Sequence, residues 1–110
     1  MDLLSIMQST PRMTHVLVVL TDRRLYGDPW DYRGISTGTI CDSAQVIVHL
    51  EHRPDDALVL AHEIAHVLGA RHDNGPGFIM AERNAGKATQ FSPATLRDIW
   101  PLLPCIRDKP

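Results

Sequence analysis

The stretch RPDDALVLAHEIAHVLGARHD, Arg53–Asp73, carries the strongest structural signal in this chain of 110 residues. Pro54 and the two aspartates after it are typical of a helix start, because proline suits the first turn and acids face the positive end of the helix dipole. Nearly every residue of Ala57–Leu68 is apolar, which predicts a buried helix. Gly69 follows, where a residue in the left-handed conformation can end the helix.

Three of the six histidines lie in this stretch, around a glutamate. Residues four positions apart on a helix share a face, so His62 and His66 can aim their rings at one point. Glu63 is rotated by roughly a quarter turn, which places its carboxylate beside that point. If the chain turns at Gly69, His72 can approach the same point. The pattern predicts three imidazole ligands with a fourth position open to water, as in catalytic zinc sites, and Glu63 as the base for that water.

The alternative interpretation is that these histidines are hydrogen-bonded core residues, which is the more common role of a single histidine on an apolar helix. Three histidines and a glutamate would be costly to bury without partners. A chance match of the six residues concerned is on the order of one in ten million per window. They are His62, Glu63, His66, Gly69, His72 and Asp73. The metal-site interpretation is therefore preferred.

The composition is that of a globular protein, with 44% hydrophobic residues, 22% charged residues and a net charge of −2. No long basic run is present, so neither nucleic acid nor an anionic membrane surface is an expected partner. No apolar run is long enough to span a bilayer, and the first residues lack the pattern of a signal peptide. We expect one domain over residues 1–110, and a monomer.

Three other segments have the composition of strands, namely His15–Leu20, Gly34–Cys41 and Ala44–Leu50. The first is rich in β-branched residues and bounded by turn residues, which predicts a strand buried on both faces. The second holds small residues and two glycines, which predicts an irregular or edge strand.

HEIAHVLGARHD resembles the HExxHxxGxxHD signature of the metzincin zinc peptidases. Its trailing Asp73 is similar to the mark of the adamalysin or reprolysin branch, which includes the ADAM proteases and snake-venom metalloproteinases. FIM, ending at Met80, resembles the methionine turn of the branch. GISTGTIC, QFSPA and CIRDKP resemble three further stretches of it. The resemblance runs from about His15 to Pro110 and is most specific at the histidine motif.

The resemblance implies an α/β fold of the α+β kind, in which a small twisted mixed sheet lies above a long zinc-binding helix. An irregular lower part would hold the methionine turn and a C-terminal helix. Ser92 and Pro93 suit the N-cap and the first turn of that helix. Its apolar stripe is expected to face the core and comprises Leu96, Ile99 and Leu103.

By the same resemblance, the protein would be a zinc-dependent endopeptidase acting on protein or peptide substrates. His62, His66 and His72 would hold one zinc ion, with Glu63 as general base and then proton donor. Met80 would form the hydrophobic floor of the site. An extended peptide would pair with the edge strand formed by Gly34, Ile35, Ser36, Thr37, Gly38 and Thr39.

The pairing of Cys41 and Cys105 is open from composition alone, because neither lies in a CxxC pair. In the branch the corresponding positions form a disulfide, which would imply a secreted, extracellular or periplasmic protein. The alternative is a cytosolic enzyme with two buried free thiols. Asp108 stands where the branch often has a calcium-binding asparagine, and its acidic partner is not found in this chain, so we expect no calcium site.

Alternatives to this interpretation remain open. The metzincin domain is nearly twice this length, so the chain would be a minimal metzincin or one trimmed at its N-terminus. A shortened sheet would favour a zinc-binding module or fragment with little catalytic activity. In a gluzincin-type site, Glu82 and not His72 would supply the third ligand. Gly69, His72 and Met80 at metzincin spacing favour the metzincin interpretation.

Overall fold

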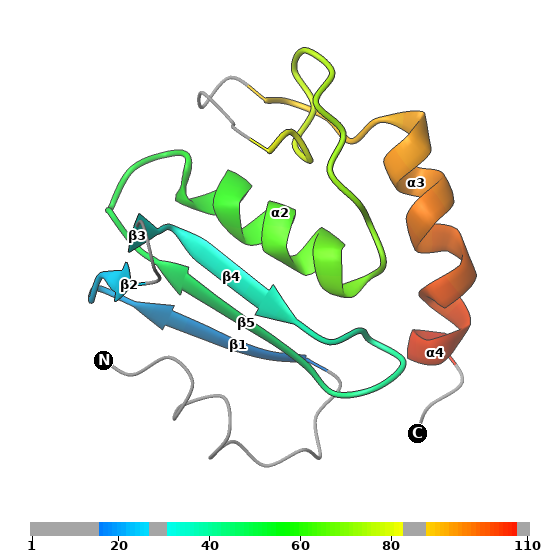
Figure 1. Cartoon of the computed structure of the whole chain (residues 1–110), viewed down its shortest axis with the longest axis horizontal. Helices are drawn as coiled ribbons and strands as arrows, with labels where there is room; N and C mark the ends of the chain where they lie inside the picture. Colours follow the sequence, from blue (N-terminus) through cyan, green and yellow to red (C-terminus); the bar gives the residue numbers. More distant parts are fainter. Residues whose placement is uncertain (1–15, 27–30, 83–87, 108–110) are drawn as a thin grey trace.

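The computed structural model describes residues 16–26, 31–82 and 88–107. Its elements are β1 (Val16–Thr21), β2 (Leu25–Tyr26), β3 (Asp31–Tyr32), β4 (Gly34–Thr37), β5 (Ala44–His49), α2 (Asp56–Val67), α3 (Pro93–Ile99), the 3-10 turn η1 (Trp100–Leu102) and α4 (Leu103–Arg107). Helix α2 lies across the main sheet, and α3 to α4 stand beside them (Figure 1). The fold is therefore α+β, as predicted.

The main sheet is mixed and has the strand order β1-β5-β4. Its central strand β5 runs parallel to β1 and antiparallel to β4. Ala44, Val46 and Val48 of β5 are buried and pack with Val67 of α2. This apolar layer holds the helix against the sheet, because burying such side chains is the main source of stability.

Strand β1 was predicted to be buried on both faces, and that prediction is wrong. Val18 is 37% exposed and Leu20 is 52% exposed. The parallel register places them on the same face as Val46 and Val48 of β5, the face that carries α2. The helix packs mainly against β4 and β5, so among the described residues it leaves the outer half of β1 uncovered. The predicted first residue, His15, lies outside the described residues.

Strand β4 forms the other edge of the sheet, as predicted, but it is shorter than the predicted segment and ends at Thr37. Gly38 has a φ of 75°, and a Cβ there would collide with the backbone oxygen of Ser43. The chain therefore turns at a glycine. The amide of Ile40 then donates to the Val67 carbonyl at 2.8 Å, which links the end of the strand segment to the end of α2.

Helix α2 has the predicted bounds to within two residues. Gly69, just beyond it, has a φ of 107°, and its amide donates to the carbonyl of His66 at 3.0 Å. A Cβ at Gly69 would lie 2.7 Å from Cδ1 of Leu102 and 3.1 Å from the carbonyl oxygen of Asp98. The glycine thus ends the helix in the left-handed conformation and also lets the C-terminal helices approach.

The start of α2 is held by an arginine that the sequence analysis did not connect to it. The Arg33 guanidinium donates to Asp55 at 2.8 Å and also to Asp56, and its Nε lies 3.2 Å from a carboxylate oxygen of Glu51. The two aspartates were assigned to the helix dipole alone. They also tie the helix to the residue that precedes β4.

Helix α3 begins as predicted, with Ser92 as N-cap and Pro93 in the first turn. The prediction for its apolar stripe is only partly right. Ile99 packs against the buried cluster around Met80, but Leu96 is 57% exposed and Leu103 is 36% exposed. The inward face of α3 is instead polar at its start, because buried Ser92 and Thr95 point toward the interior.

Cys41 and Cys105 form a disulfide, with their Cα atoms 5.1 Å apart and a sequence separation of 64. This agrees with the pairing that the resemblance implied. The bond ties the connection between β4 and β5 to α4. Among the described residues, no helix is long and apolar enough to cross a membrane.

Replacing both cysteines with serine should lower the free energy of unfolding by roughly 4 kcal/mol, because the bond closes a 64-residue loop and restricts the unfolded chain. Denaturant unfolding of the two proteins measures this difference. As a control, the unfolded and unreduced protein is treated with an alkylating reagent. An intact mass with two labels would show that the cysteines are not bridged.

Candidate metal centre

The three histidines of the motif meet at one point. His62 and His66 share a face of α2, and the turn at Gly69 brings His72 back toward them. The Nε2 atom of His66 lies 3.1 Å from that of His62 and 3.1 Å from that of His72. One nitrogen from each ring falls within 4.8 Å of the others. The structure thus brings together the residues that the sequence singled out.

Two of the rings are oriented by backbone carbonyls. Nδ1 of His62 lies 2.7 Å from the carbonyl oxygen of Ile79, and Nδ1 of His66 lies 2.9 Å from that of Ala70. A carbonyl only accepts, so each Nδ1 carries a proton, and in the neutral imidazole Nε2 then keeps a lone pair. Two lone pairs that face each other at 3.1 Å repel, and a cation between them removes that repulsion. The three histidines could therefore hold a metal ion.

The ring of His72 has different surroundings. Among the described residues, no carbonyl is found at its Nδ1. The residue as a whole is exposed, yet burial of its ring, followed by the proximity of His66 and His62, lowers the pKa of His72 below its usual value. The neutral imidazole is the form that binds metal ions, so this shift favours binding at neutral pH.

Glu63 lies beside the histidines and supplies no atom to their group. Its residue is only 9% exposed, because α2 packs here against β4. Gly34, the first residue of β4, approaches so closely that a Cβ on it would lie 2.8 Å from Cγ of Glu63. The Glu63 side chain thus contacts the start of the strand predicted to bind substrate, of which Gly34–Thr37 form β4 and Gly38 and Thr39 form the turn after it.

Met80 is fully buried in a cluster with Ala65 and Ala70. The turn that carries it contacts the site on both sides. Its neighbour Ile79 accepts the hydrogen bond from His62, and the carbonyl of Met80 accepts from the amide of Asp73 at 2.9 Å. The turn therefore supports the residues around the histidines. That Met80 forms the floor of the site stays a prediction.

Asp73 connects the metal-binding segment to α3. Its carboxylate accepts from the Ser92 hydroxyl at 2.5 Å and from the amide of Gly75 at 3.3 Å. The same hydroxyl oxygen accepts from the Thr95 amide at 3.1 Å as the N-cap of α3. From the sequence, Ser92 is predicted only as a cap. A buried serine next to a motif aspartate is visible only once the fold brings them together.

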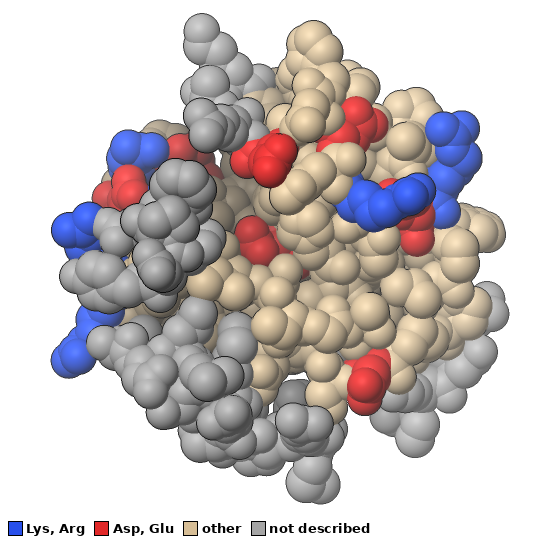
Figure 2. Space-filling view, viewed as in Figure 1, with Lys and Arg blue, Asp and Glu red and all other residues tan. Residues whose placement is uncertain are grey.

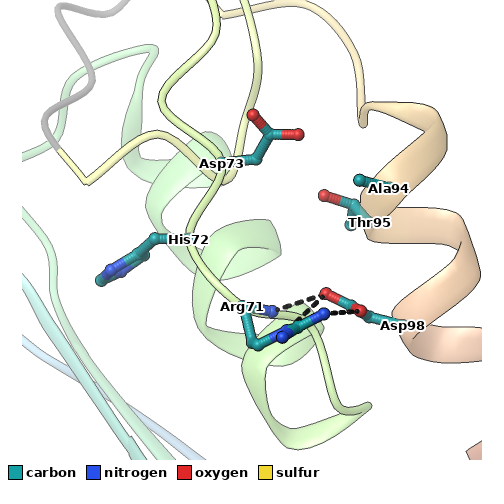
Figure 3. Close-up of a pocket in the computed structure, with 6 residues that line it drawn as sticks. All are labelled: Arg71, His72, Asp73, Ala94, Thr95 and Asp98. Atoms are coloured by element: carbon teal, nitrogen blue, oxygen red, sulfur yellow. Dashed lines mark hydrogen bonds and ion pairs between the residues drawn. The ribbon is translucent and has the colours of Figure 1, made fainter.

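A pocket of about 210 Å³ lies between residues 71–73 and α3. It is lined by Arg71, His72, Asp73, Ala94, Thr95 and Asp98. Figure 3 shows the imidazole of His72 pointing away from this pocket, while Asp98 faces Arg71 across it. Hydrogen bonds from the Arg71 side chain, and then from its backbone, lower the pKa of Asp98, so its carboxylate is ionised at neutral pH.

The face seen in Figure 2 carries its basic side chains at two edges, with acidic side chains between them. Among the described residues on this face, the basic side chains form no continuous surface.

Glu82, the alternative third ligand, lies outside the histidine group. Its amide donates to the side chain of Asn74 at 2.7 Å. The described geometry therefore favours His72 over Glu82 as the third ligand. The expectation about calcium concerns Asp108, which lies outside the described residues.

Comparison of the chain with protein-family models and with curated proteins found no match. The interpretation of the site therefore depends on its residues and on their geometry.

The chain should bind one transition-metal ion. His72→Ala should weaken that binding by more than about a hundredfold, because even a residue that only hydrogen-bonds to a metal ligand contributes tenfold to a hundredfold to the affinity. Glu82→Ala serves as the control and should bind the ion like the parent protein. Competition with a chromophoric chelator measures both affinities. Loss of binding in Glu82→Ala with retention in His72→Ala would assign the third ligand to Glu82.

Gly34→Ala should lower the free energy of unfolding by about 1–3 kcal/mol, because the added methyl group overpacks the contact with Glu63 and Val59. Metal affinity should stay the same, since the atoms nearest to the new group belong to Glu63 and Val59 and not to a histidine. Ser36→Ala in the same strand is the control for denaturant unfolding. A Gly34→Ala protein as stable as this control would contradict the close approach.

Proposed function

We propose that the protein is a zinc-dependent endopeptidase of the metzincin type. One observation carries the proposal: three histidine Nε2 atoms converge, and a buried glutamate lies beside them without joining their group. Three neutral nitrogen ligands with one position left open are typical of catalytic zinc sites, whereas structural zinc sites have four protein ligands.

The spacing of the ligand atoms supports zinc. Two nitrogens each about 2.0–2.1 Å from a tetrahedral ion lie roughly 3.3 Å apart. The Nε2 of His66 is 3.1 Å from the Nε2 of each of the other two histidines. The carbonyl bonds to Nδ1 of His62 and His66 also suit zinc, because a ligand imidazole is commonly held by such a bond at its other nitrogen.

The proposed chemistry divides between the ion and Glu63. When bound, zinc supplies a Lewis acid that makes water acidic enough to attack a carbonyl near neutral pH. Glu63 would take the proton from that water and pass it to the leaving amine of the cleaved peptide. Its place beside the histidines, and its contact with the start of β4, support this role.

The substrate would be an extended peptide that lies along β4. This strand is at the edge of the sheet, so its outer backbone groups lack a strand partner among the described residues. An extended chain can add to such an edge through main-chain hydrogen bonds. Gly34 begins this strand at Glu63, so a peptide paired there would pass close to the proposed base.

We also propose an oxidising compartment, such as the outside of the cell or a periplasm. The Cys41–Cys105 disulfide supports this location, since lasting disulfides are uncommon in the cytosol.

The second candidate is a zinc-binding module with little catalysis. The exposed Val18 and Leu20 of β1 favour it, because they leave an apolar part of the sheet uncovered by the described residues. The retention of Glu63 at the place of a general base favours the peptidase, since a module that only binds metal has no need of it.

Glu63→Gln should keep its zinc and lose peptidase activity by about a hundredfold or more, because it removes proton transfer and leaves the three ligands intact. Zinc content and cleavage of casein are measured on the same preparation. Glu82→Gln is the matched control and should retain both. A parent protein that binds zinc and cleaves nothing would favour the second candidate, and a fully active Glu63→Gln would assign the proton transfer to another group.

A further inference from the structure

The position of the His72 ring depends mainly on the backbone around it. This dependence is weaker for the rings of His62 and His66. Those two lie on the same helix, and each ring donates from Nδ1 to a carbonyl. His72 follows the helix end, and the described residues provide no carbonyl at its Nδ1. Whatever holds the chain on either side of His72 therefore sets how its Nε2 meets the others.

One carboxylate holds the residue immediately before it. Oδ2 of Asp98 accepts from the backbone amide of Arg71 at 3.1 Å. The same carboxylate also accepts from the guanidinium, with Oδ1 at 3.0 Å from Nη2. Asp98 is thus bonded to both the backbone and the side chain of one residue.

The two kinds of bond differ in what they fix. The Arg71 side chain is 85% exposed, and ion pairs that reach into solvent contribute little. Asp98 is more enclosed, with a side chain that is 17% exposed. Its bond to the amide acts directly on the chain that carries His72. A charge-assisted bond to a backbone amide is also among the stronger hydrogen bonds.

The pocket shows why packing does not replace this bond. About 210 Å³ of space separates residues 71–73 from α3, so the two segments are not in continuous contact there. They are joined at one end by Asp98 and Arg71 (Figure 3), and at the other by Ser92 and Asp73. The second link also caps α3. In the first link, all the described side-chain hydrogen bonds of Asp98 go to Arg71.

We infer that Asp98 is a positioning residue for the third metal ligand, acting through the backbone amide of Arg71. It does not touch the ion or the substrate. It holds the residue before His72 against α3, so that the imidazole reaches the nitrogens of His62 and His66. This inference rests on the proposed metal site, but it does not require the site to be catalytic.

The test compares three variants for zinc affinity and for the visible spectrum of the cobalt(II)-substituted protein, which reports ligand number and geometry. Asp98→Ala should weaken zinc binding about tenfold to a hundredfold, which is the range found when a residue that orients a metal ligand is replaced. It should also alter the cobalt spectrum. Asp98→Asn keeps an oxygen for the amide and should recover most of the affinity. Arg71→Ala keeps the amide bond and should bind zinc within a few-fold of the parent protein.

Asp22→Ala is the control for loss of an aspartate from an ion pair, because Asp22 pairs with His52 and both side chains are 75% exposed. It should change neither measurement. Thermal unfolding of the metal-free proteins separates a loss of affinity from a general loss of stability, and Asp98→Asn keeps the test valid if Asp98→Ala does not fold.

Unchanged zinc affinity and an unchanged cobalt spectrum in Asp98→Ala would overturn the inference. Equal losses in Asp98→Ala and Arg71→Ala would also overturn it, since the guanidinium and not the amide would then hold the chain. A parent protein that binds no metal overturns the proposed function and this inference together. A parent protein that binds metal, depends on Asp98 and cleaves no peptide overturns the proposed peptidase alone.

Discussion

The chain reversal at Gly69 is the constraint on which the site depends. An uninterrupted helix would carry the third histidine away from the first two, because a helix advances with every residue. The φ of 107° at Gly69 ends α2 just after its second histidine. The same residue lets Leu102 and the backbone of Asp98 approach where a side chain would otherwise stand. One glycine thus sets both the ligand geometry and the contact with the C-terminal helices.

Both apolar and polar contacts around this reversal support the site. On the sheet side, apolar side chains of β5 pack against α2, and the ion pairs of Arg33 hold the start of the helix. The side toward α3 is polar, since Ser92 and Asp98 bind the segment that follows Gly69. Hydrogen bonds are directional, whereas the hydrophobic effect is not. The directional contacts on the α3 side occur next to His72, where the orientation of a ring matters.

Local sequence patterns were enough to predict α2, its end at Gly69 and the convergence of the histidines, because each depends on residues close in the chain. The exposure of Val18 and Leu20 was not predictable in this way, since an apolar run looks alike at the edge and at the centre of a sheet. The inward face of α3 was also mispredicted. Its polar residues are buried because their partners lie far away in the sequence, and no periodicity reveals such partners.

The disulfide has a consequence for the metal site that follows from topology. Cys41 and Cys105 close a covalent ring, and all three histidines, Glu63 and Asp98 fall inside it. A small domain has only a modest free energy of unfolding, so opening the ring removes a large share of it. A larger fraction of the reduced chain is then unfolded, and the apparent metal affinity of the proposed site falls by the cost of folding that fraction. Oxidation state and metal affinity would therefore be thermodynamically linked, although neither cysteine belongs to the histidine group.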